Sequence, residues 1–201
     1  MNLGILASSI ALVLFISIAV RRQKIQKKQQ EDSFWERERR ANSVRKKPLD
    51  GLDYITVPMA DFPTHLLADN ETVSECIEIL KTLSGQKIVN LTGYSNTDLK
   101  LEYGAANITV LSEYDQNYTL LVRTLQKWAD ALIDAGHMKE ATVLMEFAIS
   151  TNTDVSRTYY CLADYWASQG ETAQIERLIT VAENLRSSTK NIIANNLRKK
   201  L

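Results

Sequence analysis

Histidine and cysteine are scarce in this chain of 201 residues, and the signatures of common catalytic sites are missing. The two histidines, His65 and His137, do not form an H-x-x-x-H pair. The sequence also contains no GxGxxG, P-loop, CxxC or GxSxG motif. We therefore predict a protein that is not an enzyme and that has no catalytic residues, cofactor or bound metal.

Cysteine and proline are both restricted to a few positions. Cys76 and Cys161 each lie in an apolar pattern of helical spacing, which favours reduced core residues over a disulfide. The three prolines, Pro48, Pro58 and Pro63, lie close together in one part of the chain. We expect this short stretch to be an extended, turn-rich linker, while the rest of the chain is free to form helices.

Charge is absent from the whole of the run from Leu3 to Val20. At about 1.5 Å per residue, a helix of this length reaches roughly 27 Å, close to the ~30 Å hydrocarbon core of a bilayer. A secretory signal peptide is the alternative, but such a peptide has basic residues before its apolar stretch. Here Arg21 and Arg22 follow the run instead. This order predicts an uncleaved transmembrane anchor.

Basic residues cluster immediately after the uncharged run, at Arg21, Arg22, Lys24, Lys27 and Lys28. Basic residues beside a membrane span stay on the cytoplasmic side, which predicts a single-pass protein of the cell membrane. Its N-terminus would lie outside and its C-terminal domain in the cytoplasm. The same five cations could contact anionic lipids or could serve only to set the topology.

The net charge of zero conceals two oppositely charged parts. Residues 21–50 contain eleven basic and five acidic residues, a net charge of +6, whereas residues 51–201 contain thirteen basic and nineteen acidic residues, a net charge of −6. Binding to phosphates requires a basic face. The acidic character of the larger part therefore argues against nucleic acid as a partner.

Two glycines, Gly136 and Gly170, lie in similar surroundings. Before and after the first glycine the shared positions are Leu125, Trp128, Ala129, Leu132, Ala141, Leu144, Met145 and Ala148. Around the second they are Tyr159, Leu162, Ala163, Trp166, Ile175, Leu178, Ile179 and Ala182. The spacing between the two sets, with this order of large, small and turn residues, indicates repeated pairs of helices with a period of about 34 residues.

This pattern resembles the tetratricopeptide (TPR) repeat. The resemblance implies repeats at about 122–155 and 156–189, a C-terminal capping helix at 189–201, and the binding of a protein or peptide partner. The chain departs from the family pattern at its closing proline, where Thr153 and Ser187 stand, and at Ile175, which replaces a small alanine. A plain antiparallel helical bundle is the alternative. The chain as a whole also resembles small single-pass membrane proteins of Gram-positive bacteria.

The predicted fold is therefore all-α, with an N-terminal transmembrane helix followed by a TPR-like antiparallel helical-repeat domain. We assign residues 3–20 to the anchor, 21–68 to a basic juxtamembrane helix and proline-containing linker, and 69–201 to the helical domain. Within that domain, Asn70 or Thr72 is expected to begin a helix with Val73, Cys76 and Leu80 at helical spacing, which stops at Gly85. Asp115 could restart a helix further along, and the last helix is expected to carry Ile192, Ile193 and Leu197 on one face.

One loop is rich in turn formers and polar side chains, at Thr92–Asp98. It could be an ordinary capped loop or a binding loop on a helical scaffold. In the second case the residues that contact the partner are Tyr94, Ser95, Asn96, Thr97 and Asp98. The nearby acidic and phenolic groups of Asp98, Glu102, Tyr103 and Asp115 leave a metal or acid–base site open as a minor possibility.

Taken together, these patterns predict a membrane-anchored, non-enzymatic adaptor or scaffold that binds a protein or peptide partner at the cytoplasmic face. A structural subunit of a larger membrane or envelope complex is the alternative. An enzyme with an unrecognised site is a distant third.

Overall fold

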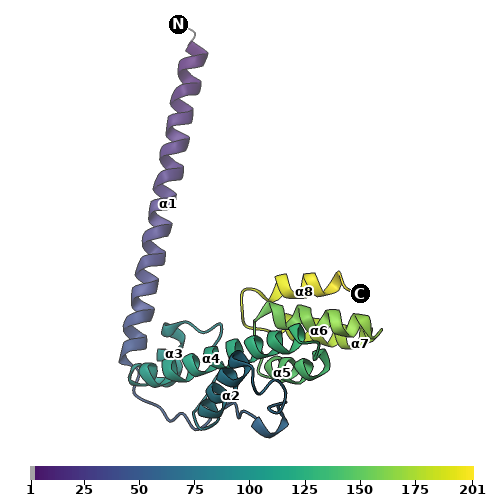
Figure 1. Cartoon of the computed structure of the whole chain (residues 1–201). Coiled ribbons are helices and arrows are strands. Elements are labelled where there is room, and N and C mark those ends of the chain that lie inside the picture. The colour runs from purple at the N-terminus through teal and green to yellow at the C-terminus, as the bar shows by residue number, and fades with distance from the viewer. Residues whose placement is uncertain (1–2) are drawn as a thin grey trace. The chain divides into compact units, whose positions relative to one another are not determined.

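The computed structural model describes the backbone of residues 3–201 and the side chains of residues 15–201. Within these residues the regular structure is helical, and the β pairing is limited to one isolated bridge between Tyr54 and Val89. The α helices are α1 (Leu3–Ser43), α2 (Glu71–Ser84), α3 (Asn96–Tyr103), α4 (Ile108–Asp134), α5 (Met138–Ser150), α6 (Ser156–Ser168), α7 (Thr172–Glu183) and α8 (Lys190–Arg198) (Figure 1). Two short 3-10 helices, η1 (Met59–Asp61) and η2 (Ala105–Asn107), complete the described regular structure. The predicted all-α class is confirmed.

The chain divides into two compact units. The smaller unit consists of the residues up to Lys47 together with Ser95–Asn107, and the larger unit consists of Pro48–Tyr94 and Ile108–Leu201. The loop that the sequence marks as a candidate binding site is divided between them, because the boundary falls between Tyr94 and Ser95.

The smaller unit is formed by α1, α3 and η2. Lys100 of α3 forms an ion pair with Glu38 of α1, and the Thr97 hydroxyl donates a hydrogen bond to the same carboxylate at 2.7 Å. At the end of α3, Gly104 has a φ of +90° and lies directly against the backbone of Arg45. A side chain at this position would collide with that backbone, so glycine is required there.

The described helices include none with the length and apolar character needed to span a membrane. This finding contradicts the predicted transmembrane anchor at Leu3–Val20 and the single-pass localisation in the cell membrane, with its outer N-terminus and cytoplasmic domain. Residues 3–14 of the uncharged run lie outside the described side chains. Within that run the side chains are described only for Phe15–Val20, and from Arg21 onward the helix is rich in charged side chains.

Two helical hairpins follow one another in the larger unit, α4–α5 and α6–α7. Their turns contain Gly136 and Gly170, which have φ values of +84° and +74° and allow the chain to reverse. The helix ends repeat with the period seen in the sequence. Thus α4 and α6 end at Asp134 and Ser168, and α5 and α7 begin at Met138 and Thr172. The predicted position of both glycines between paired helices is confirmed.

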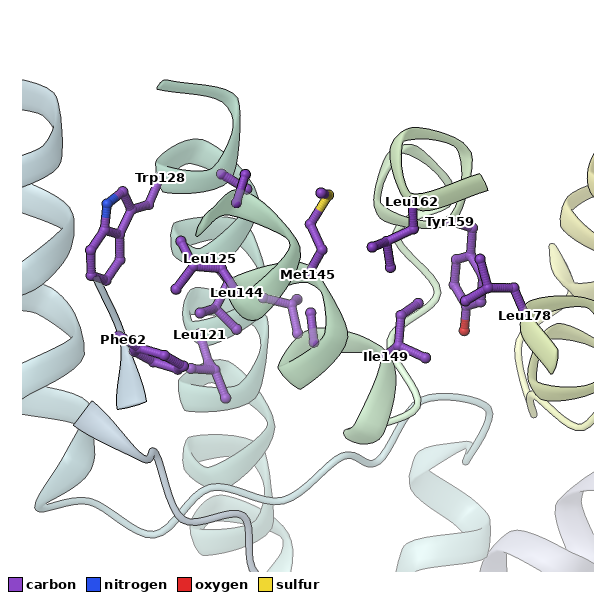
Figure 2. Packing of buried hydrophobic residues seen from close by; sticks show 14 of the residues in the cluster. Phe62, Leu121, Leu125, Trp128, Leu144, Met145, Ile149, Tyr159, Leu162 and Leu178 are labelled. Atoms are coloured by element: carbon purple, nitrogen blue, oxygen red, sulfur yellow. The ribbon is translucent and has the colours of Figure 1, made fainter. Parts of the chain in front are cut away.

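The hydrophobic core of the larger unit runs through both hairpins. Tyr159 of α6 lies beside Leu178 of α7, while Trp128 projects from the other side of α4, where Phe62 of the linker lies with its ring centroid 6.0 Å away (Figure 2). Trp128 and Tyr159 are the largest fully buried side chains. Ala129 and Ala163, which the repeat pattern places at close helix contacts, are also fully buried. Burial of this apolar surface is the main stabilising contribution to the array.

The linker and α2 add a further layer to this core. Asn70 caps α2 by accepting a hydrogen bond from the Val73 amide at 3.1 Å, as predicted, and Val57 and Phe62 of the linker are buried. α2 packs against α4, while α8 packs against α6 and α7 at the other end of the array.

Two local predictions were wrong. Asp115 does not restart a helix, because α4 runs without a break from Ile108 to Asp134. Ile192 does not share one face of α8 with Ile193 and Leu197, because its side chain is 60% exposed while the other two are buried. Ile192 projects about 100° away from Ile193 around α8, and in this structure that direction faces solvent.

Candidate functional site

An open groove of about 470 Å³ lies in the larger unit, where helices α5 and α7 end. Three parts of the chain form it, namely the linker, the segment before α3, and the end of α5 together with the loops that follow α5 and α7. The lining residues are Asp53, Ile55, Thr56, Asn90, Thr92, Phe147, Ser150, Thr151, Asn152, Asn184, Leu185, Arg186 and Ser187. Most of these side chains are amides or hydroxyls, and the charged ones are Asp53 and Arg186. The groove therefore offers hydrogen-bonding groups with little net charge.

The two hairpins contribute equivalent residues to the lining of the groove. In the register set by Gly136 and Gly170, Ser150 corresponds to Asn184 and Asn152 corresponds to Arg186. These residues end the second helix of each hairpin or follow it directly. Because packed repeats align equivalent positions along one edge, both loops reach the same groove. The same structural position thus carries an asparagine in one hairpin and an arginine in the next.

Asn90 holds the segment before α3 against the end of α5. Its amide nitrogen lies within hydrogen-bonding distance of the Thr151 carbonyl at 2.9 Å, the Asn152 carbonyl at 3.1 Å and the Tyr118 hydroxyl at 3.0 Å. Its amide oxygen accepts a bond from the Thr92 backbone N–H at 2.9 Å. Asn90 therefore satisfies carbonyls that the helix end leaves free and fixes one wall of the groove.

Two buried tyrosines hold the loop after α5, which Asn90 also contacts. The Tyr118 hydroxyl donates a hydrogen bond to the Thr151 carbonyl at 3.2 Å, and the Tyr159 hydroxyl donates one to the Thr153 carbonyl at 2.9 Å. Burial raises the pKa of Tyr118 to about 12, because the interior disfavours the phenolate. Burial also raises the pKa of Tyr159. Both groups are therefore neutral donors at physiological pH and have a structural role.

The raised pKa of Tyr118 predicts a loss of stability at alkaline pH. Its ordinary pKa is 10.0, so between pH 10 and 12 the unfolded chain loses this proton while the folded chain keeps it. The contribution of Tyr118 is complete below pH 10 and is lost as the pH rises through 12, by about 2–3 kcal/mol. Urea unfolding at a series of pH values measures this change. Tyr118→Phe is the control, and an equal alkaline loss in both proteins would contradict the assignment.

Arg186 stands at the edge of the groove against the ring of Tyr94. The centre of its guanidinium lies 4.6 Å from the centroid of the ring, which is a cation–π contact. Gly93 makes this contact possible, since its φ is +88° and a Cβ there would lie 2.7 Å from the Arg186 Cβ and 2.8 Å from the Arg186 carbonyl oxygen. The segment before α3 is thus packed tightly onto the loop after α7.

The other candidate loop residues, Ser95, Asn96, Thr97 and Asp98, belong to the smaller unit and form the start of α3. Ser95 and Asp98 make a capping box, in which the Ser95 side chain accepts from the Asp98 amide and the Asp98 carboxylate accepts from the Ser95 amide at 3.0 Å. Hydrogen bonds from Ser95, and then from Arg37, lower the pKa of Asp98. Of the five candidates, only Tyr94 lies in the same unit as the groove.

The acidic cluster considered as a metal or acid–base site does not come together in one unit. Asp98 and Glu102 lie in the smaller unit and Asp115 in the larger, where it accepts a hydrogen bond from the Leu91 amide at 3.2 Å. Across the described residues no group of three or more histidine, cysteine or acidic side chains has a geometry suited to a metal ion.

No family model, curated protein or solved structure matches this chain. The function must therefore be argued from the geometry of the groove and from the chemistry of its side chains.

Sequence reasoning missed most of the groove residues, including Asn90, Asn152, Asn184 and Arg186. A signal for some of them was present, because the repeat register aligns residues 150–153 with 184–187 and thereby predicts that the two loops share an edge. Nothing local predicted the part played by Asn90, whose partners lie in α4 and in the loop after α5. That arrangement depends on how the segment before α3 crosses the array.

Proposed function

We propose that the larger unit is a non-catalytic binding module and that the groove at the ends of α5 and α7 receives an extended segment of a partner protein. The observation that carries this proposal is the groove itself, which two equivalent loops and the segment held by Asn90 line together. On this view the protein is an adaptor or scaffold.

The chemistry of the groove suits a peptide backbone. A peptide presents alternating N–H and C=O groups. The exposed side chains of Asn152 and Asn184 can accept from a peptide N–H through the amide oxygen and donate to a peptide C=O through the amide nitrogen. Phe147 and Ile55 are only partly buried and supply apolar surface in the same groove. The groove thus combines many polar groups with a smaller apolar surface, and its polar groups can fix the orientation of a bound peptide.

The TPR-like interpretation supports the same class of function. The helix boundaries of the two hairpins repeat with the spacing of Gly136 and Gly170, and helical-repeat proteins commonly present binding surfaces built from equivalent positions. The loops after α5 and α7 differ from the TPR pattern, because Thr153 and Ser187 stand where that pattern has its closing proline. We therefore place the binding surface at these loops.

Site-directed photo-crosslinking tests the proposal. A photoreactive benzoylphenylalanine replaces Asn184 in the whole chain, which is expressed in the organism that naturally produces it. After irradiation, the crosslinked products are mapped by mass spectrometry. The matched control carries the same group at Glu176, which is exposed on α7, the helix that ends just before Asn184, but does not line the groove. We expect position 184 to crosslink to one short segment of a partner and position 176 to give no such product.

Two outcomes would contradict a peptide-binding groove. The absence of any product from position 184 would leave the groove without an occupant. Equal crosslinking from both positions, spread over a broad surface, would instead favour a subunit whose faces are covered within a larger assembly.

A further inference from the structure

We propose that Arg186 selects a carboxylate, so that the peptide bound in the groove carries an acidic side chain. This inference rests on the proposed function and specifies the chemistry of the partner.

The structure holds the Arg186 guanidinium in place from one side. The Tyr94 ring lies against it at 4.6 Å, and Gly93 allows the preceding backbone to approach the main chain of Arg186. The Arg186 side chain is exposed, and none of the described hydrogen bonds or ion pairs uses its N–H groups, so these groups stay available. A side chain held in this way loses less conformational freedom when it binds a ligand than a free arginine does.

The charge of Arg186 has no acidic partner among the described residues. Three other arginines of the array differ in this respect, because Arg157 pairs with Asp130, Arg177 with Glu146 and Arg198 with Glu183. Arg186 is therefore a positioned cation at a groove whose remaining lining is neutral, apart from Asp53. A fixed and unpaired guanidinium of this kind is suited to bidentate binding of a carboxylate.

An acidic peptide fits these observations better than a nucleic acid. A polyphosphate chain needs several cations along its path, whereas this groove has one, and residues 51–201 have a net charge of −6. A single carboxylate needs only one guanidinium. Asp53 in the same lining disfavours a second acidic group, so we expect one acidic position in the bound peptide.

The experiment selects peptides and then measures how they depend on Arg186. Random linear peptides displayed on phage are selected on the full-length chain and read out by sequencing. The best peptide is synthesised in two forms, with its acidic residue intact and with that residue changed to the corresponding amide. Fluorescence anisotropy gives the affinity of both peptides for the wild type, Arg186→Gln, Arg186→Lys and Arg123→Gln.

We expect the selected peptides to share one acidic position. The wild type should bind the acidic peptide about 10- to 100-fold more tightly than the amide form, which is the range for a hydrogen bond to a charged group. Arg186→Gln should abolish this preference, and Arg186→Lys should retain part of it because lysine keeps the charge but lacks the planar fork. Arg123→Gln, at an exposed arginine of α4 outside the groove, should behave as the wild type.

The outcomes separate this inference from the proposed function. Peptides that bind but share no acidic position, or whose preference survives Arg186→Gln, would overturn the role of Arg186 and leave the peptide groove intact. Failure to select any peptide would overturn both. Arg186-dependent binding of a short single-stranded oligothymidylate, tighter than that of any selected peptide, would show that the groove recognises phosphate instead.

Discussion

Replacing Gly93 with alanine should lower the free energy of unfolding by about 2–4 kcal/mol and separate Tyr94 from Arg186. The backbone at this position has a φ of +88°, which costs an L-residue roughly 1–2 kcal/mol. The new Cβ would also lie 2.7 Å from the Arg186 Cβ and 2.8 Å from its carbonyl oxygen. Because the second atom belongs to the backbone, the loop after α7 must move, and overpacking of this kind costs about 1–3 kcal/mol more.

Gly136→Ala is the matched control for this prediction. Gly136 has a similar φ of +84°, but a Cβ there would meet no atom within 4 Å. Its substitution should therefore show only the conformational cost, about 1–2 kcal/mol. Urea unfolding of both variants isolates the steric part as the difference between them. Equal losses in the two proteins would mean that Gly93 does not approach Arg186 closely.

Replacing Asn90 with alanine should destabilise the larger unit by about 2–4 kcal/mol. The substitution removes the amide that bonds the Thr151 and Asn152 carbonyls and the oxygen that accepts from the Thr92 amide. Each partly buried polar group left without a partner costs about 1–3 kcal/mol, and water that enters the open groove offsets part of the sum. Hydrogen exchange should in addition show a faster rate at the Thr92 amide, which loses its acceptor.

Asn117→Ala provides the comparison for Asn90. Asn117 is also a half-buried asparagine, but its side chain makes one hydrogen bond, to the Lys87 carbonyl at 3.0 Å. We expect a loss of about 1 kcal/mol and no change in exchange at Thr92. Equal free energies of unfolding for Asn90→Ala and Asn117→Ala would contradict the role of Asn90 in fixing the wall of the groove.

The helices of this protein could be predicted largely from local sequence. Helical spacing of Val73, Cys76 and Leu80 located α2, and Gly136 and Gly170 located the turns of both hairpins. These signals are local because the backbone hydrogen bonds of a helix join residues four positions apart. The unpredicted exposure of Ile192 arose where two adjacent isoleucines left the orientation of α8 ambiguous.

The transmembrane prediction was wrong for a different reason. It relied on the absence of charge from Leu3 to Val20 and on the cations that follow, which are statements about composition. The described helices contain no segment that meets the requirement for length and apolar character.

The sequence by itself determined that this chain forms helices, where its hairpins turn and which faces are buried, because those properties depend on neighbours a few positions away. The tertiary structure alone decided that the Thr92–Asp98 loop is divided, with Tyr94 in one unit and Ser95–Asp98 in the other. It alone also brought Tyr94 to Arg186 and Asn90 to the end of α5. These contacts join residues that are distant in the chain, and they exist only after the repeats have packed and aligned their ends along one edge.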